Sequence, residues 1–130
     1  MIVDHPERVK GIAGILEKLL ASGGSAVLLW RNNAEMRALL GHFGFRVRRS
    51  ELRGTRRLEF IDFSHRLFRD YLKINAGTWF DILFFRIPQI APPPDARIIA
   101  TFDGSIPAVM ERKCGKGTLF VLAFPPSPSW

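Results

Sequence analysis

Two carboxylates and a histidine stand close together near the middle of the chain, at Asp62, His65 and Asp70. Such a set can bind a metal ion, or the histidine can move protons during hydrolysis or group transfer. The spacing around a turn matches no strong metal-ligand pattern, so we expect no metal site. The preferred interpretation is turn chemistry, in which Asp62 or Ser64 accepts backbone donors while His65 caps or packs.

The single cysteine, Cys114, excludes an internal disulfide framework and a cysteine-built metal site. Arg112, Lys113 and Lys116 would lower the pKa of its thiol and favour the thiolate. However, its place in a hairpin gives it no helix N-terminus, no sequence-adjacent base and no oxyanion hole. We therefore interpret Cys114 as an incidental thiol. Glu111 is assigned to an exposed strand face.

Basic residues concentrate in one segment, which contributes to a formal charge of +7. Its arginines are Arg46, Arg48, Arg49, Arg53, Arg56 and Arg57. Such density can mark a contact with phosphate or an anionic surface. Alternatively, charged side chains on an edge strand can prevent that strand from pairing with another chain. Because no aromatic residue interleaves with these arginines, the second interpretation is preferred. Any nucleic-acid binding should be weak, sensitive to salt and indifferent to base sequence.

The 130 residues, 47% of them hydrophobic, indicate one domain over residues 1–130. No apolar run approaches the ~20 residues that a membrane helix needs, so we expect no membrane insertion by this chain itself. The N-terminus lacks the pattern of a secretory signal.

Hydrophobic spacing predicts an amphipathic helix over residues 6–21, a buried strand over 26–30 and a helix that Asn32 or Asn33 caps and that ends at Gly44. Strands are predicted at 45–48 and 58–63, a short helix within 64–71 and an extended stretch at 79–90. Three strands follow at 97–102, 108–112 and 118–124, joined by tight turns. The last is apolar on both faces and should be central. This order predicts an α/β fold.

Several segments together resemble the class I glutamine-amidotransferase-like domain, and most closely its copy in bacterial Bat-type aerotolerance membrane proteins. They are residues 21–29, 40–45, 62–68 and 96–124, the last with a Phe-Asp-Gly-Ser-x-Pro-Ala turn and a Gly-Lys-Gly turn. The resemblance implies a flavodoxin-like α/β core. For most such copies it implies no demonstrated chemistry, and it implies a parent protein with membrane helices and a von Willebrand factor A-type domain.

Relative to that family, the chain begins after the first strand and stops where relatives run on. It is therefore a fragment or a shortened copy, and its sheet is expected to be incomplete. An incomplete sheet favours pairing with another chain. We expect self-association, most simply as a two-fold dimer with residues 125–130 at or near the contact.

The amidotransferases of this family place a catalytic cysteine on a sharp strand-to-helix elbow. The matching positions here are Arg31, Asn32 and Asn33, which offer neither thiol nor hydroxyl. The resemblance therefore implies a domain without catalytic residues or cofactor, acting as a structural or protein-interaction module of a larger, membrane-associated bacterial protein. Two alternatives stay open: a small hydrolase or transferase using the Asp62, His65 and Asp70 region, and a phosphate- or nucleic-acid-binding domain using residues 46–57.

Overall fold

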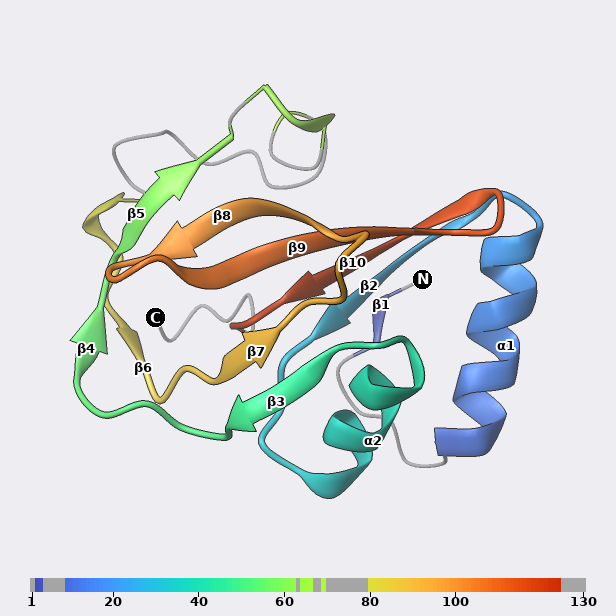
Figure 1. Cartoon of the computed structure of the whole chain (residues 1–130), viewed down its shortest axis with the longest axis horizontal. Helices are drawn as coiled ribbons and strands as arrows, with labels where there is room; N and C mark the ends of the chain where they lie inside the picture. Colours follow the sequence, from blue (N-terminus) through green and yellow to red (C-terminus); the bar gives the residue numbers. More distant parts are fainter. Residues whose placement is uncertain (1, 4–8, 63, 67–68, 70–79, 125–130) are drawn as a thin grey trace.

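A six-stranded mixed sheet forms the centre of the computed structural model, which describes residues 2–3, 9–62, 64–66, 69 and 80–124 (Figure 1). The strand order is β1-β2-β10-β9-β8-β5. In that order their bounds are Ile2–Val3, Ser25–Leu29, Gly117–Leu122, Ile106–Cys114, Arg97–Phe102 and Leu58–Ile61. β1 and β10 run parallel to β2, and the other neighbours pair antiparallel. The predicted α/β class and the antiparallel strands near the C-terminal end are confirmed.

β10 is the central strand that its apolar sequence predicts. It lies between β2 and β9, and all six of its residues are buried. The sequence of a strand that is covered on both faces is a continuous apolar run, because both sets of alternating side chains enter the core.

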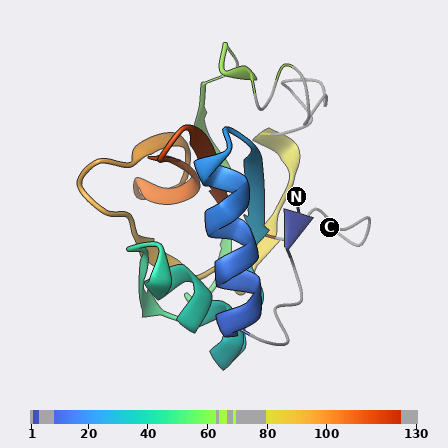
Figure 2. The ribbon, with the colours of Figure 1, turned by 90° about the vertical axis from the view of Figure 1, so that its right-hand side faces the viewer.

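Two helices pack beside each other next to this sheet (Figure 2). α1, Val9–Ala21, buries Leu16 and Leu20 and contacts β2, β10 and β9. α2, Ala34–His42, begins at Asn33, whose side-chain oxygen accepts the backbone N–H of Met36 at 2.8 Å. Of the two predicted caps, the structure thus selects Asn33.

Two short ribbons lie outside the main sheet. β3, Arg46–Arg49, pairs with β7, Gln89–Ala91, while β4, Thr55–Arg56, pairs with β6, Phe84–Phe85. The predicted strand at 45–48 exists, displaced by one residue. The prediction of one extended stretch over 79–90 is wrong, because Phe80 and Asp81 are helical and the two strands that follow are separate.

A short strand precedes the first helix. Ile2 and Val3 form β1, which pairs with Val27 and Leu28 of β2. Val3 is buried, whereas Ile2 is exposed. No helix among the described residues is long and apolar enough to cross a membrane.

Candidate functional site

Asp62 follows β5 and closes a tight turn with Ser64. Its Oδ1 accepts the Ser64 backbone N–H at 3.1 Å and the Ser64 hydroxyl at 2.5 Å, while its Oδ2 lies 2.7 Å from Arg97 Nη2. The Ser64 hydroxyl, with further help from the backbone donor and from Arg97, lowers the pKa of Asp62 although partial burial opposes the shift. The predicted turn chemistry of Asp62 is confirmed.

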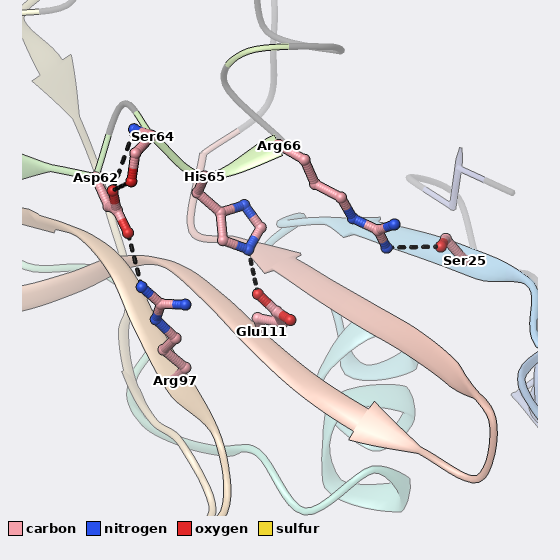
Figure 3. Close-up of polar contacts among 7 residues, drawn as sticks. All are labelled: Ser25, Asp62, Ser64, His65, Arg66, Arg97 and Glu111. Atoms are coloured by element: carbon pink, nitrogen blue, oxygen red, sulfur yellow. Dashed lines mark hydrogen bonds and ion pairs between the residues drawn. The ribbon is translucent and has the colours of Figure 1, made fainter.

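His65 lies against the carboxylate of Glu111 (Figure 3) and also against an aromatic ring. Its Nε2 contacts Glu111 Oε2 of β9, and the two side chains are only 8% and 13% exposed. The ring also meets Phe120 edge-on, with centroids 5.7 Å apart. His65 therefore packs, as the sequence predicts, but the assignment of Glu111 to an exposed strand face is wrong.

The pair borders a polar hollow of about 440 Å³, which we call the His65 hollow. Its lining comprises Asp62, Ser64, His65, Arg66, Arg97, Glu111, Lys113 and Thr118. Asp70, the third member of the predicted cluster, lies outside the described residues. Within the described part of the chain, no three His, Cys, Asp or Glu side chains gather closely enough to hold a metal ion.

The His65 hollow lies at the amino ends of the parallel strands. β5, β8, β9 and β10 are successively antiparallel, so β5 runs opposite to β10 and β2. The segment after β5 consequently reaches the start of β2, where Arg66 Nη2 lies 3.5 Å from Ser25 Oγ. Open α/β sheets bind ligands at the carboxyl ends instead. The His65 hollow therefore lies at the edge opposite to the usual binding edge of such sheets.

The strand-to-helix elbow occupies the opposite edge, directly after β2. Trp30 N–H donates to Leu122 O, and Asn33 is engaged as the cap of α2. Asn32 Oδ1 accepts from Arg37 Nη1 at 3.0 Å. The elbow thus presents amide and guanidinium groups, neither of which attacks a carbonyl carbon.

Cys114 ends β9, far along the sheet from this elbow. Its thiol is partly buried, and that burial raises its pKa although Arg112 pulls in the other direction. The thiolate that nucleophilic catalysis requires is disfavoured as a result.

The six arginines do not form one patch. Arg46, Arg48 and Arg49 are exposed on β3, and exposed Arg53 follows in the connection to β4. Arg56 and Arg57 instead hold the β8–β9 turn: Arg56 Nη1 donates to Asp103 O at 3.0 Å, and the Arg57 backbone N–H donates to Asp103 Oδ2 at 3.1 Å. Arg56 and Arg57 thus have a structural role that the sequence did not reveal.

No protein-family model and no curated protein matches this chain. Solved structures share its fold at low sequence identity. A cytoplasmic protein from Salmonella typhimurium LT2 has a TM-score of 0.62 and 13% identity over 92% of this chain and 51% of its own. The mmIFT52 N-terminal domain has a TM-score of 0.59 and 14% identity, over 95% of this chain and 64% of its own.

A β-galactosidase from Rahnella sp. R3 has a TM-score of 0.57 and 17% identity over 94% of this chain but only 18% of its own. The chain therefore spans less than two thirds of each of these proteins. At such identities the likeness shows the fold alone.

Proposed function

We propose that this chain is a non-catalytic, flavodoxin-like domain of the class I glutamine-amidotransferase-like type. It serves as a structural or protein-interaction module of a larger, membrane-associated bacterial protein. The observation that supports the proposal is the elbow after β2. Arg31, Asn32 and Asn33, which the resemblance matches to the nucleophile position, offer neither thiol nor hydroxyl, and Asn33 caps α2. The raised pKa of Cys114, at the end of β9, weighs against the other nucleophilic candidate.

The structural neighbours support a modular role. The same fold makes up 18% of one β-galactosidase and 51% of a cytoplasmic protein. A fold shared by parts of such different proteins is not tied to one reaction.

An exposed apolar edge supports contact with another protein. Phe60 on β5 is 52% exposed, and Ile98 on the neighbouring β8 is 40% exposed. β5 is the last strand of the six-stranded sheet, and a sheet edge offers backbone groups for pairing.

A second candidate is a small hydrolase or transferase, favoured by the His65–Glu111 pair at the rim of the His65 hollow. A carboxylate beside a histidine orients the imidazole for proton transfer. Against this function, the Ser64 hydroxyl already donates to Asp62 at 2.5 Å, and the hollow lies at the amino ends of β2 and β10.

Hydrolysis assays separate the two candidates. Glutamine and an activated ester are incubated with the full chain and with Cys114→Ser and His65→Gln. We expect no turnover above the buffer rate in any of the three. Turnover that falls by ~100-fold in Cys114→Ser would contradict the non-catalytic proposal, and the same loss in His65→Gln would favour the hydrolase.

A further inference from the structure

A second hollow of about 440 Å³ lies beside the β4–β6 ribbon and is unrelated to His65. Glu51, Arg53, Thr55, Phe85 and Arg86 contribute to its lining, and we call it the Phe85 hollow. Its size falls within the ~300–1,000 Å³ of small-ligand sites.

The structure supplies the aromatic ring that the arginine-rich segment lacks in sequence. Phe85 of β6 pairs across the ribbon with Thr55 of β4, so a ring from a distant segment stands beside Arg53. Phe85 is 64% exposed. An exposed ring of this size gives a flat face on which a planar group can stack.

Two arginines line the hollow together with that ring. Arg53 and Arg86 are both exposed, and Arg48 and Arg49 precede the hollow in the sequence, on β3. Across the described residues, the ion pairs involve none of these four arginines. Glu51, the acidic residue of the lining, is engaged by Asn32, whose Nδ2 lies 3.5 Å from Glu51 Oε1. The arginines are thus available to an anionic ligand.

The backbone at Arg86 is strained. Its φ of 53° lies in the left-handed region, which favours glycine. Strained non-glycine residues persist where the surrounding structure holds them and concentrate at ligand sites. Here the strain falls on an arginine that lines the hollow.

The hollow also lies near the edge of the sheet where α/β proteins bind ligands. Asn32, in the elbow at the carboxyl end of β2, reaches Glu51 of the hollow. The carboxyl ends of parallel strands are the usual binding edge of an open sheet. Through the Asn32–Glu51 contact the Phe85 hollow is connected to this edge, whereas the His65 hollow lies at the opposite one.

We propose that the Phe85 hollow binds single-stranded nucleic acid without base preference. One base stacks on Phe85, and the flanking phosphates meet Arg53 and Arg86. A protruding aromatic face beside arginines suits a base and its phosphates better than an acidic peptide, which offers charge without a planar group. This site goes beyond the proposed protein-interaction role and does not depend on it.

Fluorescence anisotropy with a labelled oligothymidine and a labelled oligoadenine, at two salt concentrations, tests the site on the full chain. We expect dissociation constants of ~1–100 µM that weaken as salt rises. Phe85→Ala should weaken binding about tenfold, because it removes the stacking face. Ile15→Ala, which truncates a comparably exposed apolar side chain on α1, outside the hollow and outside the β8–β5 edge, is the control and should leave binding unchanged.

Arg86→Gly separates a binding defect from a folding defect. Glycine suits the positive φ, so this variant should be at least as resistant to denaturant as the wild type. It should nevertheless bind more weakly, with a slope of log K against log salt that is shallower by about one unit. Lys18→Ala, which removes one exposed charge from α1, should change that slope less.

Three results would overturn the proposal. The first is no binding at ~100 µM protein in low salt. The second is a Phe85→Ala variant that binds as tightly as the Ile15→Ala control. The third is equal affinity for a poly-glutamate peptide of the same charge, since that would show that the hollow binds polyanions by charge alone and does not recognise a base.

Discussion

At the scale of single residues, the polar groups after β5 anchor a loop to the sheet. Glu111 and Arg112 are neighbours on β9 and, by the alternation of a strand, point to opposite faces. Arg112 Nη1 donates to Phe43 O at the end of α2, whereas Glu111 meets His65. The His65 segment therefore covers the face of the sheet opposite to α2.

The carboxyl group of Asp62 should titrate below its ordinary value of 3.8, because Ser64 and Arg97 stabilise the charged form. These interactions stabilise the fold above that value, and their contribution is lost as the pH falls through the lower pKa of the folded state. NMR titration of the full chain measures the midpoint directly.

Ser64→Ala should move the Asp62 midpoint up toward 3.8, since the Ser64 hydroxyl is the largest cause of the shift. Ser22→Ala is the control, because that hydroxyl donates to Leu19 O instead. An Asp62 midpoint that is indifferent to Ser64→Ala would show that the hydroxyl contact does not persist in solution.

At the scale of elements, the start of β10 is pressed against the end of α1. A Cβ atom on Gly117 would stand 2.3 Å from Gly24 O and 2.6 Å from Leu20 O, both of them backbone atoms. This close approach brings the β9–β10 hairpin onto the helix, and only glycine permits it.

Gly117→Ala should therefore destabilise the protein by about 1–3 kcal/mol, the usual cost of overpacking. Gly14→Ala adds the same methyl group within α1, where nothing lies within 4 Å, and should stabilise by about 0.5–1 kcal/mol through helix propensity. Denaturant unfolding compares the two. Equal stability of both variants would contradict the packing described here.

Local signals made several elements predictable from sequence. Asn33 stands where a cap is needed, and the apolar run of β10 requires cover on both faces. The turns that join the last three strands contain Gly104 and Gly115, whose φ values of 80° and 60° favour glycine. These features depend on neighbouring residues alone.

Contacts between distant segments could not be predicted in the same way. The pairing of His65 with Glu111 depends on which strand lies beneath the turn after β5. The position of Phe85 beside Thr55 depends on a ribbon outside the main sheet. Strand order and direction fix both contacts, and no local pattern in the sequence specifies that order.

At the scale of the whole molecule, the outer edge of the sheet and the arginine-rich side suggest two different kinds of contact. Phe60 and Ile98 expose apolar surface at the β8–β5 edge, while Arg48, Arg49 and Arg53 give the other region its charge. Apolar surface favours association, and a net charge of +7 opposes it through repulsion between copies. Self-association should therefore strengthen as salt screens that repulsion.

The claim that this domain acts through protein contacts is tested most directly by its mass in solution. Size exclusion coupled to light scattering is run on the full chain, on the double variant Phe60→Asp with Ile98→Asp, and on a chain ending at Pro125. The last variant probes the expected contact at residues 125–130, which lie outside the described residues. We predict a two-fold dimer of the 14.8 kDa chain that the edge variant dissociates. A monomer at tens of micromolar in every salt condition, unchanged by either variant, would contradict the account.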